Sequence, residues 1–327
     1  MPGHSHHGFE LQLAGPHCAI IYISLRHFDR LIRSVLRCHI CLTNPTEARM
    51  AKTWLITGSS RGLGRALAEA VLGAGDNLVA TARNIHSLED VSDRYAAQVI
   101  LRPLDVTDFG AAQAAVNAAV ERFGRLDVVA NVAGYGNLGP IEDTSIEDFR
   151  AQIDTNLFGP IYLSKAAIPI MRAQGSGHIL NFSSVGGRIG STGRAPYSAA
   201  KFGVEGFSEA MVTELAPLGV KVTIFEPGGF RTDFAGSSQT IHKIRPEYDA
   251  TVGQAARFQR DYDGKQPGDP AKAAQAILKV VGMDDPPLRL LLGSDAVRIV
   301  ESADARKAEG DRKWSDLSAS TDFAVAS

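Results

Sequence analysis

From Thr53 onward, short apolar runs alternate with longer stretches in which apolar residues recur at helical spacing. The apolar runs have the length of β-strands, and we expect strands at 53–57, 77–82, 98–104, 127–133, 178–183, 220–225 and 288–292. The stretches between them predict amphipathic helices at 64–72, 87–95, 109–123, 145–173, 196–216 and 270–281. Gly159-Pro160 is expected to break the longest of these helices, because proline removes a backbone donor.

Strands that alternate with helices are typical of α/β proteins, in which right-handed crossovers build a parallel sheet covered on both faces. The short strands are apolar throughout, as expected for strands that are buried on both sides. We therefore predict a single doubly wound parallel sheet of the Rossmann-like type, with helices on both faces. Ligands of such sheets bind beyond the carboxyl ends of the strands, so candidate site residues should lie there.

The composition changes abruptly at Met50. The whole chain of 327 residues has 34 Lys and Arg against 36 Asp and Glu, a balance that excludes binding to polyanions through bulk charge. All three cysteines lie before Met50, so disulfides and thiolate metal sites are excluded from the remainder, and a cytoplasmic location is expected. We expect an N-terminal extension outside the fold at 1–49, one domain at 50–311 and a flexible C-terminal tail at 312–327.

Two interpretations of the N-terminal extension remain open. Residues 20–41 place arginines on one helical face and apolar side chains on the opposite face, which is typical of helices that contact membranes or direct targeting. The basic face carries Arg26, Arg30, Arg33 and Arg37. The alternative is that the folded part begins at Met50 and does not need the extension. Cys38 and Cys41 form a single Cys-x-x-Cys pair without a second pair at zinc-ribbon spacing, so no metal site is expected.

The first expected strand ends in a glycine-rich loop, Thr57–Gly64, with the spacing G-x-x-x-G-x-G. Glycines permit a tight turn and a close approach of the backbone to a pyrophosphate. The helix that follows directs its free N–H groups and the positive end of its dipole at that anion. No Gly-Lys-Ser/Thr follows, so a P-loop is disfavoured and the position between strand and helix favours a dinucleotide site.

The end of the second strand indicates which dinucleotide binds. A site for NAD(H) usually has an acidic residue there for the ribose 2′-hydroxyl, whereas this chain has Arg83. The planar guanidinium of Arg83 would bind a 2′-phosphate, and Arg61 in the glycine loop can supply a second cation. We therefore expect NADP(H) in preference to NAD(H).

Tyr197 and Lys201 are four residues apart at the start of an expected helix, so their side chains share one face. A cation beside a phenol lowers its pKa from about 10 and makes it a usable proton donor or acceptor near neutral pH. Ser183-Ser184 ends a strand, where a hydroxyl can hydrogen-bond a substrate oxygen or cap a loop, and Asn156 is a polar residue inside an apolar helix. The chain lacks a G-x-S-x-G elbow, which disfavours a serine hydrolase.

In this order the motifs resemble the short-chain dehydrogenase/reductase family, in its shorter branch, from about Lys52 to Leu292. The motifs are Thr57–Gly64, Asp105-Val106, Asn131–Gly134, Asn156, Ser184, Tyr197–Lys201 and Pro227-Gly228. The resemblance implies that Tyr197 is the acid in reduction and the base in oxidation, while Lys201 lowers its pKa and holds the nicotinamide ribose. It also implies that Ser184 orients the reacting oxygen and that Asn156 holds a water in a proton relay.

The same resemblance implies a set of cofactor contacts that follows the carboxyl edge of the sheet. These contacts run from the adenine, at Asp105 and Val106, past Asn131 to the nicotinamide end at Pro227, Gly228 and Thr232. The complete set of expected contacts is Thr57, Gly58, Ser60, Arg61, Gly62, Leu63, Gly64, Arg83, Asp105, Val106, Asn131, Tyr197, Lys201, Pro227, Gly228 and Thr232.

The stretch at about 230–268 has no strand periodicity and corresponds to the substrate-covering lid of the family. Phe230, Phe234 and Tyr135 indicate a largely apolar pocket. We therefore predict an enzyme that interconverts a carbonyl and a secondary alcohol on a mainly apolar small molecule. A carboxylate or acyl-carrier substrate stays open because of three arginines near these motifs, namely Arg188, Arg194 and Arg231.

The alternative function is a catalytically silent regulatory protein that only binds a dinucleotide. The intact set of Ser184, Tyr197 and Lys201 argues against it. Expected partners are a small-molecule carbonyl or alcohol and further copies of the chain in a homodimer or homotetramer, without nucleic acid. Membrane contact is expected only if residues 20–41 form the amphipathic helix.

Overall fold

The computed structural model describes residues 50–323 except 235 and 237. The expectations for 1–49, including the helix at 20–41 and the Cys-x-x-Cys pair, lie outside the described residues, as do those for 324–327. Within the described part, no helix has the length and the apolar character needed to cross a membrane.

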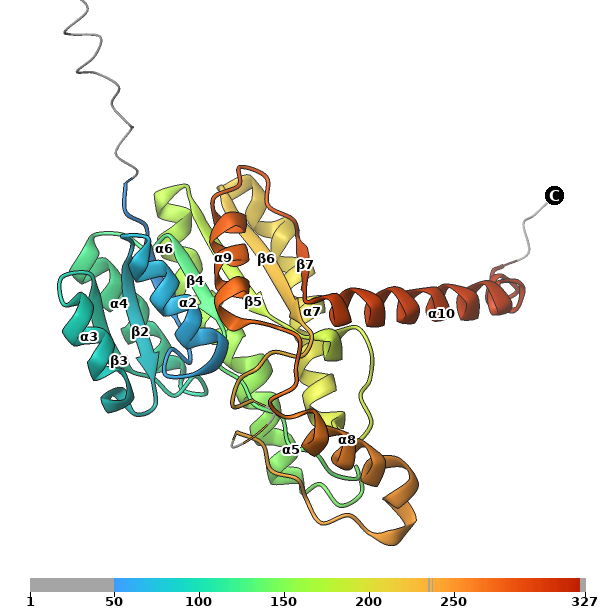
Figure 1. Cartoon of the computed structure of the whole chain (residues 1–327). Coiled ribbons are helices and arrows are strands. Elements are labelled where there is room, and N and C mark those ends of the chain that lie inside the picture. The colour runs from blue at the N-terminus through green and yellow to red at the C-terminus, as the bar shows by residue number, and fades with distance from the viewer. Residues whose placement is uncertain (1–49, 235, 237, 324–327) are drawn as a thin grey trace, which may run out of the picture. The chain divides into compact units, whose positions relative to one another are not determined.

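A parallel sheet of seven strands forms the centre of the described residues (Figure 1). The strands are β1 (Thr53–Ile56), β2 (Asn77–Ala82), β3 (Val99–Pro103), β4 (Val128–Asn131), β5 (Gly177–Phe182), β6 (Val220–Pro227) and β7 (Arg289–Leu292). Their order is β3-β2-β1-β4-β5-β6-β7, which confirms the predicted doubly wound sheet. The order of the strands in the sheet reverses between β1 and β4, and a crevice for ligands is expected at the carboxyl ends of these two strands.

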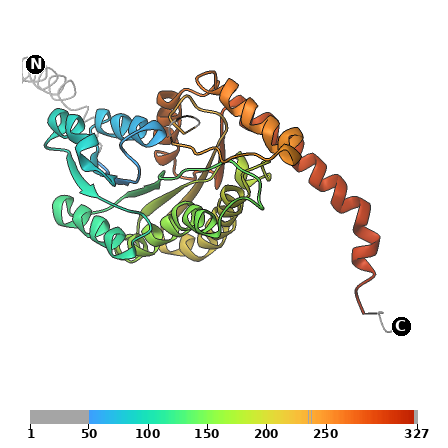
Figure 2. The same cartoon turned by 90° about the horizontal axis from the view of Figure 1, so that it is seen from below.

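Helices cover both faces of the sheet, as the view in Figure 2 shows. One face carries α2 (Gly62–Gly73), α3 (Glu89–Tyr95) and α9 (Pro270–Val281). The other face carries α4 (Phe109–Phe123), α6 (Gly159–Gln174) and α7 (Ala195–Leu215). The remaining helices are α5 (Ile146–Ile153), α8 (Gln254–Tyr262) and α10 (Ser294–Ala319). Short helical turns are η1 (Ile85–Leu88), η2 (Asp154–Phe158), η3 (Val185–Gly187), η4 (Ala216–Leu218), η5 (Pro246–Tyr248) and η6 (Asp249–Gly253).

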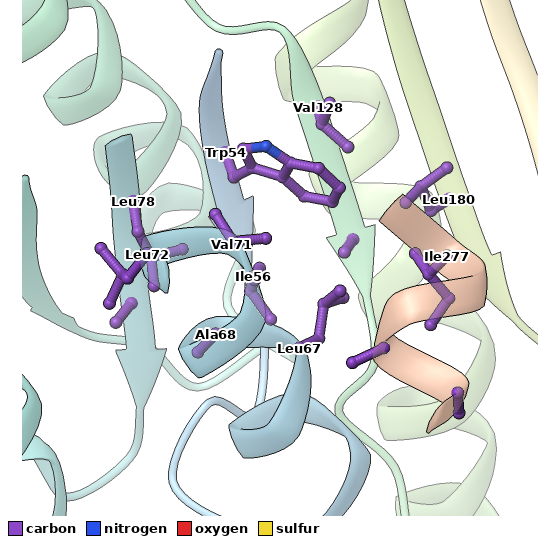
Figure 3. Packing of buried hydrophobic residues seen from close by; sticks show 14 of the residues in the cluster. Trp54, Ile56, Leu67, Ala68, Val71, Leu72, Leu78, Val128, Leu180 and Ile277 are labelled. Carbon is purple, nitrogen blue, oxygen red and sulfur yellow. The ribbon is translucent and has the colours of Figure 1, made fainter. Parts of the chain in front are cut away.

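The core has one apolar layer on each side of the sheet, because successive strand residues point to opposite faces. Trp54 and Ile56 pack with Leu67 of α2 and Ile277 of α9 (Figure 3), while Leu55 packs into the layer under α4 and α6. All of these side chains are fully buried. The apolar character of the whole strand therefore follows from burial on both faces.

Two features differ from the expected pattern. The helix predicted at 145–173 is not broken at Gly159-Pro160; α5 continues through the π-helical turn η2 into α6. Pro160 occupies the first turn of α6, where a missing N–H costs little. In addition, α10 continues to Ala319, beyond Asp311, where we expected a flexible tail to begin. No proline interrupts this stretch, and alanine, arginine and lysine favour helix.

The segment 230–268 contains η5, η6 and α8 and has a small apolar cluster of its own. Val252 and Ala256 pack on Leu138, which belongs to the loop after β4. An isolated bridge pairs Leu138 with Ile241. The segment thus rests on the carboxyl edge of the sheet, next to the expected ligand crevice.

Candidate active site

The glycine loop joins β1 to α2 and forms a backbone cradle. Gly58 and Gly62 have φ values of +69° and +57°, in the left-handed region that favours glycine. A Cβ on Gly64 would lie 2.2 Å from the carbonyl oxygen of Gly58, so only glycine allows the loop and the helix to approach this closely. Arg61 precedes α2 without capping it through its side chain, which leaves the first N–H groups of the helix free for an anion.

A cavity of about 920 Å³ follows the carboxyl edge of the sheet from the glycine loop to Tyr197. Most of the expected site residues line it, namely Gly58, Ser60, Arg61, Gly62, Leu63, Gly64, Arg83, Asp105, Val106, Ser184, Tyr197, Lys201, Pro227, Gly228 and Thr232. Thr57, Asn131 and Asn156 are not among its lining residues. The Thr57 hydroxyl accepts two backbone N–H groups after β4, and the Asn131 amide donates to Asn181 at 2.8 Å. These two side chains therefore hold strand ends together instead of facing the cavity.

Arg61 and Arg83 lie at the glycine-loop end of the cavity. Both side chains are exposed, and neither forms a salt bridge with any described residue. Arg83 lies near Asp105, where the backbone N–H and hydroxyl of Thr107 hold the pKa of the carboxyl below its usual range and Arg83 adds to this effect. Both guanidinium groups are free to meet an anionic group of a ligand.

Three polar side chains meet at the other end of the cavity. Tyr197 projects from α7, and Ser184 follows β5. A Cβ atom added to Gly186 would lie 3.2 Å from Tyr197 Cε1 and 3.6 Å from Ser184 Oγ, so both side chains border the space beside this glycine. The phenol ring and the hydroxyl thus face the same small space. Lys201 Nζ lies 5.6 Å from the centre of the Tyr197 ring and donates to the Phe182 carbonyl at 2.7 Å.

The environment of these groups shifts their pKa values in opposite directions. Burial raises the pKa of Tyr197, while the Ser184 hydroxyl and the charge of Arg194 act to lower it. Burial lowers the pKa of Lys201 to about 8, and the carboxylate of Glu205 acts against this shift. Arg194 is thus a cation near the phenol that the Y-x-x-x-K motif did not indicate.

Asn156 lies in the π-helical turn η2 and is fully buried. Its amide donates to the carbonyls of Tyr135 and Gln152 at 2.8 Å each, and its Oδ1 accepts the Tyr135 N–H at 3.1 Å. The position of a Cβ on Gly134 lies 2.6 Å from Asn156 Oδ1 and 3.7 Å from Lys201 Nζ. Asn156 therefore fixes the loop after β4 directly beside the lysine, and π-helical turns of this kind are frequent at functional sites.

A cluster of buried charges lies behind Lys201. Arg289 Nε lies 3.0 Å from Glu205 Oε2 and 3.4 Å from Glu226 Oε1, and Arg188 Nη1 lies 3.0 Å from Glu226 Oε1. Burial and the nearby Glu226 raise the pKa of Glu205, whereas Arg289 lowers it. This cluster accounts for Arg188, which we had left open as a ligand for an acidic substrate: it does not line the cavity.

The distal half of the cavity is the part lined by the segment 230–268. Phe230 and Phe234 line it, and the rings of Phe234 and Tyr197 are 5.7 Å apart. Arg194 and Gln266 also line the cavity. Gln266 is 1% exposed, and neither its amide nitrogen nor its amide oxygen has a partner among the described residues.

Sequence analysis found only part of the polar lining of this half. Arg194 was one of three open candidates, and Arg231, another of them, is exposed and donates to the backbone carbonyl of Gln266. Gln259 of α8 also lines the cavity and accepts from Arg194 at 2.9 Å. No local motif marks Gln259 or Gln266, because their role depends on how a long segment folds back over the sheet.

A glycine cradle, a doubly wound sheet and a tyrosine–lysine–serine cluster at its carboxyl edge define the class of an oxidoreductase with a dinucleotide-binding fold. The family model described as short chain dehydrogenase matches residues 52–242, and the chain belongs to the short-chain dehydrogenase/reductase family. The resemblance inferred from the motifs is confirmed, and the chain is an oxidoreductase enzyme.

Relatives and solved structures agree with this assignment. The chain is 47% identical over 270 residues to Oxidoreductase BOA17 of Botryotinia fuckeliana, covering 82% of this chain and 98% of the relative. A crystal structure of a short-chain dehydrogenase from Streptomyces avermitilis is 39% identical, with a TM-score of 0.79 over 84% of this chain and 100% of that one. An alcohol dehydrogenase from Thermococcus sibiricus, solved with 5-hydroxy-NADP, is 26% identical, with a TM-score of 0.61 over 74% of this chain and 96% of that one.

Proposed function

We propose that the chain interconverts a carbonyl and a secondary alcohol on a mainly apolar small molecule, with NADP(H) as the redox partner. The observation that carries this proposal is the convergence of Ser184, Tyr197 and Lys201 in the cavity that begins at the glycine cradle. The cavity volume of about 920 Å³ is sufficient for a dinucleotide together with a small substrate.

Each of the three side chains has a defined task in this proposal. A bound nicotinamide dinucleotide supplies or accepts the hydride at the substrate carbon. In reduction, the Tyr197 phenol donates its proton to the carbonyl oxygen, and the Ser184 hydroxyl holds that oxygen in place. Lys201 stabilises the phenolate that remains, and in oxidation the same phenolate removes the proton from the alcohol. Asn156 positions the loop beside Lys201, where a water can connect the ammonium with solvent.

The preference for NADP(H) is supported by the charges at the glycine-loop end. Arg61 and Arg83 are free of salt bridges within the described chain, and the residue after Arg83 is Asn84, not an acid. A 2′-phosphate would meet two guanidinium groups there, whereas a 2′-hydroxyl would lack the carboxylate acceptor that NAD(H) sites provide.

The reaction is tested with Tyr197→Phe and a panel of ketones and aldehydes. Loss of the phenol hydroxyl should abolish NADPH-dependent turnover, while NADPH binding, followed by fluorescence titration, should change little. Tyr95→Phe is the matched control, because Tyr95 lies on α3 outside the cavity. Turnover by Tyr197→Phe at the rate of the unaltered enzyme would contradict the acid–base assignment.

The cofactor preference is tested with Arg83→Asp. Loss of a charge-assisted contact is worth about 1.5–3 kcal/mol, so the ratio of NADPH to NADH affinity should fall by roughly 10- to 150-fold. Arg94→Asp makes the same charge change on the exposed surface of α3 and should leave the ratio unaltered. An unchanged ratio in Arg83→Asp would refute the phosphate contact.

We further propose that the chain forms a homodimer or homotetramer through the surface where α4, η2 and α6 meet. Phe109 and Phe158 are about two-fifths exposed, and their rings lie 5.6 Å and 5.9 Å from the ring of Tyr162. An exposed aromatic cluster of this kind is typical of subunit interfaces. Phe158→Asp should reduce the mass measured by light scattering, whereas Phe258→Asp on α8 should not; an unchanged mass in Phe158→Asp would place the interface elsewhere.

A further inference from the structure

Arg194 lines the cavity and differs from the other partly buried arginines in its lack of a salt bridge within the described chain. Five arginines of the described chain are partly buried, namely Arg65, Arg125, Arg188, Arg194 and Arg289. Four of them form salt bridges with carboxylates. Arg194 forms none with any described residue, although desolvation makes an unpaired charge costly.

The partners of Arg194 are all neutral. Its Nη2 donates to Gln239 Oε1 at 3.0 Å and to Gln259 Oε1 at 2.9 Å, and its Nη1 donates to the Gly136 carbonyl at 3.4 Å. A guanidinium has five N–H donors, so two remain without an acceptor among the described residues. Burial lowers the pKa of Arg194, and the negative charge of a Tyr197 phenolate acts against this effect.

The guanidinium also lies beside the reacting phenol. The position of a Cβ on Gly136 is 2.9 Å from Tyr197 Cδ2 and 3.3 Å from Arg194 Nη1, so both groups border the same space. Arg194 precedes Tyr197 by nearly one helical turn and lines the distal half of the cavity. The glycine cradle and the two arginines for a 2′-phosphate lie at the opposite end.

These observations lead to a statement about the substrate. We propose that the substrate is a carbonyl or alcohol compound that carries a carboxylate, and that Arg194 binds this carboxylate while Tyr197 acts on the oxygen that reacts. The carboxylate would supply the countercharge that the chain does not provide and would accept a hydrogen bond from one of the two unused N–H groups. Phe230 and Phe234 would contact the apolar part between the two functional groups. This inference rests on the proposed carbonyl–alcohol reaction and narrows its substrate class.

The experiment compares keto acids of increasing chain length with their methyl esters, using NADPH and the full-length enzyme. Each pair differs in charge but hardly in shape, so the ratio of kcat/KM for acid and ester isolates recognition of the carboxylate. We expect the acid to exceed its ester by roughly 10- to 150-fold at the best chain length, mainly through a lower KM. Because this ratio is measured on the unaltered enzyme, it does not depend on whether a variant folds.

Variants then identify the residue responsible. Arg194→Met should reduce the ratio to about one, and Arg194→Lys should restore part of it, because the ammonium keeps the charge without the planar fork. Arg260→Met is the matched control; it removes the same charge from an exposed position of α8 and should keep the ratio of the unaltered enzyme. A structural role alone would instead make Arg194→Met lower the values for acid and ester equally.

The outcomes separate this inference from the reaction on which it rests. Turnover of the esters without preference for any acid would overturn the carboxylate proposal and leave the reaction intact. Equal losses for acid and ester in Arg194→Met would overturn the role of Arg194. Absence of turnover with every acid and ester, and also with every ketone and aldehyde of the panel, with either NADPH or NADH, would overturn both.

Discussion

His178 should make the protein less stable as the pH falls. Its side chain lies in β5 with 4% exposure, and its Nε2 is 2.9 Å from the Thr223 hydroxyl. Burial lowers the pKa of His178 from 6.5 to about 3, and the positive charges of Lys221 and Lys52 add to this effect. The native state therefore keeps the imidazole neutral at pH values where the unfolded chain protonates it.

The direction and the size of the effect follow from linkage. Below pH 6.5 the unfolded state binds one more proton than the native state, so the free energy of unfolding falls as the pH decreases toward the native pKa of about 3. Each pH unit in this window is worth about 1.4 kcal/mol. At about pH 5 the loss caused by His178 should therefore be ~2 kcal/mol relative to neutral pH.

Urea unfolding at about pH 7.5 and pH 5 measures this contribution in the unaltered chain and in His178→Gln, at one fixed protein concentration. The variant loses packing at both pH values, but its pH-dependent loss should be smaller by ~2 kcal/mol, because glutamine has no proton to bind. His86→Gln is the matched control, since His86 is exposed. An equal pH dependence in the unaltered chain and in His178→Gln would refute the reasoning.

Three further substitutions test the cradle, the cavity wall and the core. Gly64→Ala should lose NADPH binding in a fluorescence titration, because its Cβ would lie 2.2 Å from a loop carbonyl, whereas Gly73→Ala has nothing within 4 Å and should bind normally; tight binding by both would contradict the cradle geometry. Gln266→Met should raise the free energy of unfolding without ligands by about 1 kcal/mol, because it removes an unpartnered buried amide, while Gln98→Met should lower it through the loss of two hydrogen bonds. If both variants changed the free energy of unfolding in the same direction, Gln266 would not be an unpaired amide. Leu67→Ala should lower the same quantity by about 2–5 kcal/mol in urea unfolding, and a loss under about 1 kcal/mol would contradict its full burial between α2 and the sheet.

The fold could be predicted from sequence because its elements depend on local periodicity. The helix at Phe109–Phe123 has the predicted bounds, and no end of a strand differs from its predicted position by more than two residues. The π-helical turn at Asp154–Phe158 could not be predicted, since it inserts one residue into a helix without a distinctive sequence. Pro160, which was expected to break this helix, instead occupies the first turn of α6 after η2.

Part of the candidate site has a local signal in the sequence, and part depends on contacts between distant segments. Tyr197 and Lys201 lie on one face of α7, so their spacing revealed them. Arg194 bonds Gln239 and Gln259, which are 45 and 65 residues away, and no local pattern indicates contacts of that kind. Asn131 belongs to a motif expected at the cofactor, yet its side chain joins β4 to β5. A motif therefore identifies a position in the fold, while the direction of the side chain depends on tertiary contacts.

The two ends of the cavity are built from different kinds of atoms, and this affects how the enzyme can change. At the glycine loop the ligand would meet main-chain groups, and Gly64 tolerates no larger residue. At the distal end the surface consists of side chains such as Arg194, Gln259 and Phe234, two of which belong to the segment 230–268. Replacements there alter the chemistry offered to the substrate without moving the backbone of the cradle. New substrate ranges should therefore be accessible, to directed evolution as to natural divergence, through side-chain changes at the distal end alone.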